Sequence, residues 1–171
     1  ELKVPHGDTL NDLASLIPVF MSYLLSFIYI GIYWNNHHHL IKTASKVTGP
    51  ILWANLHLLF WLSLIPFATG WLGENHFAPV PAAVYGGILL MAAIAFFGLQ
   101  QSILASIGTG SILHQVLGTD WKGKISPILY VIGIVTVYWS QWISIGIYIL
   151  VALIWIIPDR RFERAVQNDE S

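Results

Sequence analysis

The chain has 171 residues, of which 56% are hydrophobic and only 10% are charged. A soluble domain carries about 25% charged residues, so this composition indicates an integral membrane protein. The chain contains no cysteine, which excludes disulfides and thiolate metal sites, and its net charge of −1 offers no basic surface for nucleic acid.

Charged residues divide the sequence into four runs. Positions 13–41, 47–73, 75–119 and 125–158 contain no Asp, Glu, Lys or Arg. Crossing a hydrocarbon layer of about 30 Å takes about 20 helical residues. The first two runs therefore predict one membrane helix each, over residues 13–41 and 50–72.

The third run predicts a single crossing over residues 81–107. Pro79 and Pro81 suit the start of a helix, and the stretch GTGSILHQVLGTD interrupts the helix after Ile107. That stretch is too short to cross the bilayer again, so we expect a surface segment there.

The fourth run is long enough for two short helices. As one straight helix it would measure about 50 Å, well beyond the thickness of a bilayer. A turn at Tyr138–Gln141 divides it into helices over residues 125–138 and 142–157. Each would cross with local thinning of the bilayer.

The basic residues favour this division. They gather after the first helix, after the third and after the last run, at Lys42, Lys46, Lys122, Lys124, Arg160, Arg161 and Arg164. The positive-inside rule places all three clusters in the cytoplasm, so an even number of crossings separates the second from the third. We therefore predict an all-α integral membrane protein. Residues 1–171 form one transmembrane domain of five crossings with a cytoplasmic C-terminus, and a further helix is expected upstream of Glu1.

Polar side chains within hydrocarbon are costly, so their positions are informative. The first helix ends in YWNNHHHL, and the charge pattern places this stretch and Asn55 of the second helix on the cytoplasmic side. His37, His38 and His39 point about 100° apart on a helix and cannot converge on one metal ion. Acid–base catalysis would need a carboxylate partner, and none lies within the four runs. We therefore expect no metal site, no cofactor and no enzymatic activity.

Two other roles fit these residues. His39, which lies near Lys42, suits an anchor at the membrane surface, whereas Asn36, His37, His38 and Asn55 suit hydrogen bonds between helices. The sequence contains no TVGYG filter, no arginine-repeat voltage sensor and no acidic ring within a helix.

Three stretches carry a resemblance to a known family. YIGIYWNNHHHL, ILWANLHLLFWLSLIPFATGWLGENH and the terminal IPDRRFE are similar to the prokaryotic transmembrane protein 175 family of potassium channels, relatives of the lysosomal potassium channel. The resemblance implies a six-helix subunit that assembles as a homotetramer. In that family the first helix lines the ion path and carries an Arg-x-x-x-Phe-Ser-Asp signature. That helix would precede Glu1, so the pore constriction is assigned to no residue of this sequence.

The resemblance also implies a role for the polar cluster. One set of residues matches a W-x-N-H-H pattern and a second matches W-x-N: Trp34, Asn36, His37 and His38, and Trp53 and Asn55. In the family these side chains form a hydrogen-bond network that holds the signature of the first helix and does not touch the ion.

Together these features predict a potassium-preferring cation channel in a bacterial cell membrane. Conduction would be passive, with potassium as the permeant ion and with the lipid bilayer and further copies of the subunit as partners. A proton-coupled transporter that uses His37, His38 or His57 as a relay is an alternative. A non-conducting membrane assembly subunit is a third possibility.

Overall fold

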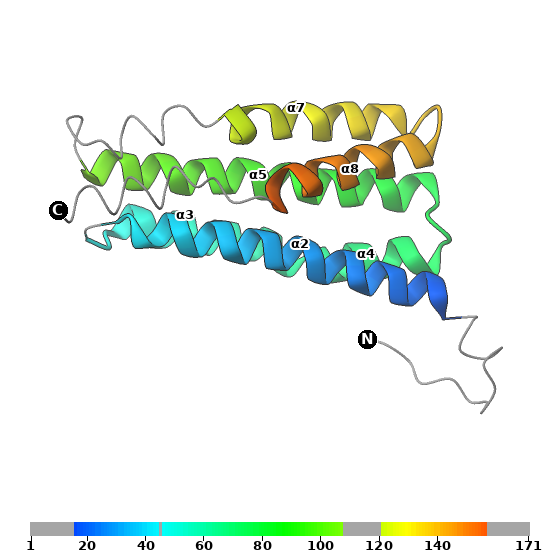
Figure 1. Ribbon diagram of the computed structural model, residues 1–171, viewed down its shortest axis with the longest axis horizontal. Coiled ribbons are helices and arrows are strands. Elements are labelled where there is room, and N and C mark those ends of the chain that lie inside the picture. The colour runs from blue at the N-terminus through cyan, green and yellow to red at the C-terminus, as the bar shows by residue number, and fades with distance from the viewer. Residues whose placement is uncertain (1–15, 45, 108–120, 157–171) are drawn as a thin grey trace.

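The computed structural model describes residues 16–44, 46–107 and 121–156 (Figure 1). These residues form helices joined by turns, which confirms the predicted all-helical class for the part of the chain described. The helices are α2 (Ile17–Lys42), α3 (Gly49–Ser63), α4 (Ile65–Glu74), α5 (Pro79–Ile107), α7 (Trp121–Thr136) and α8 (Gln141–Ile156). The expected start of the first helix at 13–15, the surface segment at 108–120 and the arginine cluster lie outside the described residues.

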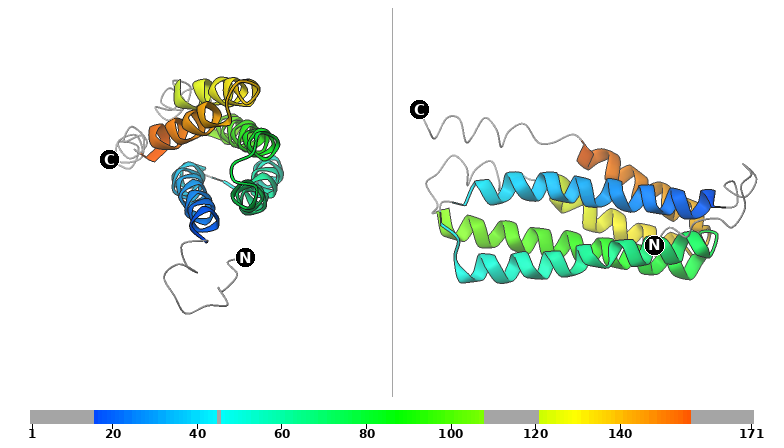
Figure 2. Two further views of the ribbon diagram at one scale, coloured as in Figure 1. Left: turned by 90° about the vertical axis from the view of Figure 1, so that its right-hand side faces the viewer. Right: turned by 90° about the horizontal axis from the view of Figure 1, so that it is seen from below.

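The helices run back and forth along one long axis. Seen end-on, α5 lies between the α3–α4 pair and the α7–α8 pair, and α2 packs beside α4 (Figure 2). With 29 residues, α5 is about 44 Å long, whereas α7 and α8 have 16 residues and measure about 24 Å each. We call the end of the bundle where α2 ends and α3 begins the lysine end, because Lys42 and Lys46 lie there. The first turn of α7, with Lys122 and Lys124, lies in the same half of the bundle but begins part of the way along α5 (Figure 1).

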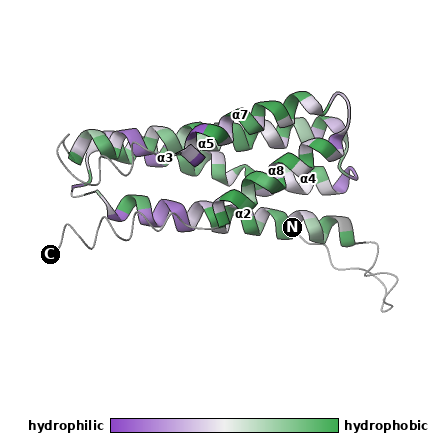
Figure 3. Ribbon diagram, turned by 45° about the horizontal axis from the view of Figure 1, so that its top comes forward, coloured by the Kyte–Doolittle hydropathy of each residue, from purple (hydrophilic) through white to green (hydrophobic). Residues whose placement is uncertain are grey.

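Most residues of the helices are apolar (Figure 3), and many large apolar side chains are exposed. Among the described residues, two segments are long and apolar enough to cross a membrane, Gly49–Glu74 and Pro79–Ile107, and Gln141–Ile156 is a shorter apolar helix. Only 22% of the most apolar window of Gly49–Glu74 is buried, whereas the core helix of a soluble protein would be mostly buried. Exposed side chains such as Phe27 and Phe67 therefore suit contact with lipid or with another subunit.

The second predicted helix is interrupted in the structure. We predicted one membrane helix over residues 50–72, and Gly49–Glu74 is one membrane-length segment in which α3 ends at Ser63 and α4 begins at Ile65, on either side of the single residue Leu64. Pro66 has no N–H group, so it cannot donate the helical bond to the Leu62 carbonyl. The Leu64 N–H bonds to the Trp61 carbonyl at 3.2 Å, and Pro66 sits in the first turn of α4, where no N–H is needed.

Four tyrosines occupy the centre of the bundle. Tyr29, Tyr85, Tyr130 and Tyr148 are each at most 2% exposed. The Tyr148 ring meets Tyr85 edge-on at 5.7 Å and lies 6.2 Å from Tyr130. The Tyr29 hydroxyl donates to the Tyr148 carbonyl, and the Tyr148 hydroxyl donates to the Ala82 carbonyl at 3.3 Å. These contacts tie together α2, α5, α7 and α8.

Two glycines make room for the Tyr148 ring. A Cβ atom on Gly86 of α5 would lie 2.0 Å from the Tyr148 hydroxyl oxygen, and one on Gly133 of α7 would lie 2.4 Å from Tyr148 Cε1. Both distances are far below van der Waals contact. The close approach of α5 and α7 to Tyr148 therefore requires glycine at both positions.

We expect Gly86→Ala to destabilise the protein by about 1–3 kcal/mol, because the added methyl group displaces a ring that its neighbours hold in place. Gly87→Ala is the matched control, since a Cβ atom there meets nothing within 4 Å. The control should be neutral or should stabilise the helix by up to about 1 kcal/mol. Thermal unfolding in detergent measures both, and equal midpoints for the two variants would contradict the packing described here.

Candidate functional site

The predicted polar residues lie in the C-terminal half of α2 and in the first turns of α3. One pair of them joins the two helices: Nε2 of His37 lies 2.6 Å from Oδ1 of Asn55. An amide oxygen only accepts hydrogen bonds, so the Nε2 atom carries the proton in this contact. Both side chains are partly buried, which strengthens the bond relative to one in water.

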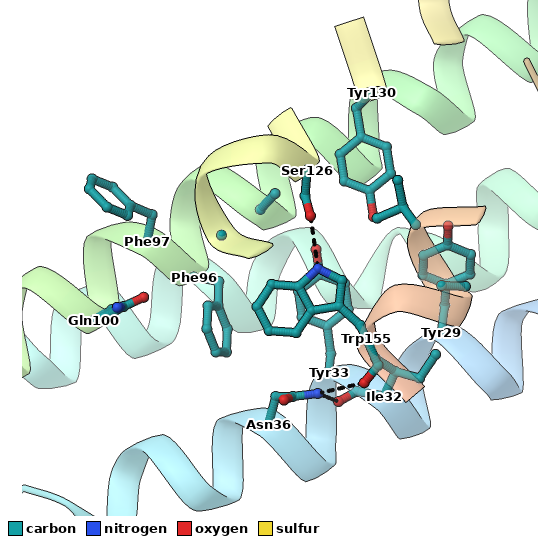
Figure 4. A pocket seen from close by; sticks show the side chains of 14 residues that line it. Tyr29, Ile32, Tyr33, Asn36, Phe96, Phe97, Gln100, Ser126, Tyr130 and Trp155 are labelled. Atoms are coloured by element: carbon teal, nitrogen blue, oxygen red, sulfur yellow. Dashed lines mark hydrogen bonds between the residues drawn. The ribbon is translucent and has the colours of Figure 1, made fainter. Parts of the chain in front are cut away.

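Asn36 faces a different helix. Its amide nitrogen donates to the Ile32 carbonyl one turn earlier at 2.8 Å and lies 3.5 Å from the Trp155 carbonyl of α8 (Figure 4). The side chain next to His37 therefore turns towards α8, because adjacent residues on a helix point about 100° apart.

The remaining predicted residues are at the surface of the subunit. The rings of Trp34 and His38 stack on each other, with centroids 5.4 Å apart and planes inclined by 11°. Trp34 is 64% exposed, and Trp53 of α3 is 74% exposed. The six predicted residues thus divide into three sets: a pair between α2 and α3, a contact to α8, and exposed aromatic rings.

The described histidines do not gather into a cluster with other metal-binding side chains. Within the described ranges, no group of three or more His, Asp or Glu side chains lies close enough to hold a metal ion. His57 instead accepts a bond from Nε1 of Trp61 at 3.3 Å, one turn further along α3.

A narrow crevice separates the C-terminal half of α2 from α5, α7 and α8. Its volume is about 30 Å³, and six of its fourteen lining residues are aromatic: Tyr29, Tyr33, Phe96, Phe97, Tyr130 and Trp155. Polar side chains of Asn36, Gln100 and Ser126 also line it (Figure 4). A space of this size holds one or two water molecules but no larger ligand.

Reasoning from the sequence missed Trp155 and Ser126 as part of this region. Nε1 of Trp155 donates to the Ser126 hydroxyl at 2.8 Å, which joins α8 to α7. From the sequence alone, a tryptophan near the end of an apolar helix is interpreted as an anchor at the membrane surface. Nothing in the spacing of 29 positions between these residues indicates that they pair.

Comparisons with known proteins place the chain in a family. The family model described as endosomal/lysosomal potassium channel TMEM175 matches residues 1–66. A protein of Chryseobacterium sp. named as a potassium channel is 52% identical over 169 residues, which cover 99% of this chain and 88% of that protein. A potassium channel of Chamaesiphon minutus is 28% identical over 165 residues, covering 90% and 81% of the two chains. No solved structure matches the chain.

The family match includes the whole of α2 and α3, the helices that carry all six predicted polar residues. The relative with 52% identity covers the rest of the bundle as well. The chain therefore belongs to the TMEM175 family of endosomal/lysosomal potassium channels.

Proposed function

We propose that the protein is a potassium channel that conducts passively across a bacterial cell membrane. The observation that carries this proposal is the 52% identity, over nearly the whole chain, to a protein named as a potassium channel. Relatives from Chamaesiphon minutus and Streptomyces collinus bear the same name. Conduction down a gradient requires no chemical step, and potassium ions are the permeant species.

The lysine end faces the cytoplasm in this proposal. Lys42 and Lys46 lie at that end and Lys122 and Lys124 lie in the same half of the bundle, whereas Glu74 lies at the opposite end. Positive charge gathers on the cytoplasmic side of membrane proteins. The charge distribution therefore supports five crossings of this sequence and a cytoplasmic C-terminus.

Four subunits surround the ion path, and a helix upstream of Glu1 lines it. This part of the proposal draws on the family resemblance, which assigns the constriction to the first of six helices. In the described helices, the His37–Asn55 bond fixes the spacing of α2 and α3. The exposed rings of Trp34, His38 and Trp53 offer a surface that the pore helix would contact.

Ion flux through reconstituted protein tests the proposal. Liposomes that contain the full-length protein should release potassium down its gradient without any imposed proton gradient, and should not release N-methyl-D-glucamine. A proton-coupled transporter would instead require a pH gradient and would saturate with one solute. If the reconstituted protein passes no potassium, the proposal that it is a channel is refuted and the role of a non-conducting assembly subunit is favoured.

We expect Trp34→Ala and Trp53→Ala to weaken assembly while the subunit stays folded. Both side chains are exposed in the described helices, so their loss should change the stability of the packing among those helices by only about 0.5 kcal/mol. A buried tryptophan at an interface contributes about 2 kcal/mol or more, so the tetramer fraction and the potassium flux should both fall.

Native mass spectrometry in detergent measures the assembly. Trp139→Ala is the matched control, since Trp139 is 75% exposed in the turn between α7 and α8 at the other end of the bundle. Tetramer fractions and fluxes equal to those of the control would show that Trp34 and Trp53 face lipid.

A further inference from the structure

A chain of side-chain contacts crosses the crevice from α2 to α7. The Tyr33 ring of α2 meets Phe96 of α5 edge-on at 6.2 Å, and Phe96 meets Trp155 of α8 edge-on at 5.8 Å. Trp155 then donates its indole N–H to the Ser126 hydroxyl of α7 at 2.8 Å (Figure 4). Four helices are thus connected through one tryptophan.

The orientation of Trp155 is fixed at its polar end. Ser126 is 1% exposed, and its hydroxyl donates to the Lys122 carbonyl at 2.7 Å. With its proton engaged, the hydroxyl oxygen presents lone pairs, which is what an indole N–H requires. Loss of this acceptor removes the partner that holds the indole N–H towards α7.

The chain of contacts ends next to the paired residues of α2. Tyr33 lies four positions, about one helical turn, before His37, which bonds to Asn55 of α3. Asn36, between them, lies 3.5 Å from the Trp155 carbonyl. The C-terminal half of α2 therefore meets the α7–α8 hairpin through these side chains, across a crevice that the helices themselves do not close.

We propose that Trp155 is a positioning residue that transmits the position of the α7–α8 hairpin to the C-terminal half of α2. It acts through Phe96 and Tyr33 and does not touch the ion. Because α2 carries the side chains that face the pore helix, Trp155 sets the conductance of the channel. This last step rests on the function proposed above.

Potassium flux and a cycle of two substitutions test the conductance. Trp155→Phe keeps a ring against Phe96 but removes the N–H donor, and Ser126→Ala removes its acceptor. Each should lower the flux about threefold to tenfold, as expected for loss of one buried hydrogen bond. The potassium flux of the double variant should be no lower than that of Trp155→Phe alone, because both changes break the same hydrogen bond. Trp139→Phe is the control and should conduct like the parent protein.

Distances between spin labels test the positioning without requiring conduction. The chain contains no cysteine, so Lys42→Cys at the end of α2 and Ala105→Cys near the end of α5 provide the only labelling sites. Both positions are exposed. Labelled protein diluted with unlabelled protein reports distances within one subunit.

The distance distribution should widen in Trp155→Phe and in Ser126→Ala and should stay unchanged in Trp139→Phe. If Trp155→Phe does not yield folded protein, Ser126→Ala decides the question alone. If the distance distributions of both variants are as narrow as that of Trp139→Phe, the inference is overturned. It is also overturned if the double variant loses flux by the combined effect of the two single substitutions. A parent protein that passes no potassium refutes the channel, and the label distances still decide whether Trp155 positions α2.

Discussion

The helices of this protein depend on one constraint: hydrocarbon offers no water, so polar groups within it are stabilised by partners inside the protein. Among the buried side-chain polar atoms of the described residues, only the Tyr85 hydroxyl lacks a hydrogen-bond partner. Short hydroxyl side chains meet the constraint locally, as Ser22 does at the Val19 carbonyl and Thr69 at the Ile65 carbonyl. Longer side chains meet it across helices. The bonds made by Tyr29, His37 and Trp155 each join two helices, so satisfying the polar groups also fixes how the helices are arranged.

The same constraint gives α2 two different kinds of contact. Its N-terminal half lies alongside α4 with many backbone contacts, around a cavity of about 140 Å³ that Ser22, Ser26, Thr69 and Gly70 line. Its C-terminal half carries large polar and aromatic side chains that reach α3, α5 and α8 individually. Helices that touch along their backbones are held by many small contacts. Helices held through a few side chains depend on each of them, which is why single substitutions near Tyr33 or Trp155 should act on α2.

The positions of charge and proline along the sequence predict much of the fold. The four charge-free runs contain most of each helix, although α7 begins at Trp121 and so includes Lys122 and Lys124, before the predicted start at residue 125. The turn between α7 and α8 spans residues 137–140, within one residue of the predicted Tyr138–Gln141. The break at Leu64 follows from Pro66 and could have been expected, although the even hydropathy of the run conceals it.

The hydrogen-bond partners of the polar residues are harder to predict from the sequence. His37, Asn36 and Trp34 are neighbours in the sequence, yet the structure directs them to α3, to α8 and to the surface. Which partner each of these side chains meets depends on which helices lie on each side of α2. The packing of α8 beside α2 depends in turn on buried glycines and tyrosines that are distant in the sequence.

The central claim is that the assembled protein is a pore that prefers potassium. The most direct measurement is the reversal potential of single channels of the full-length protein in a planar bilayer, with potassium on one side and sodium on the other. A potassium channel gives discrete current steps and a reversal potential displaced towards the potassium equilibrium potential. A current that reverses at zero under these conditions, or the absence of current steps from protein that is folded and assembled, would contradict the account.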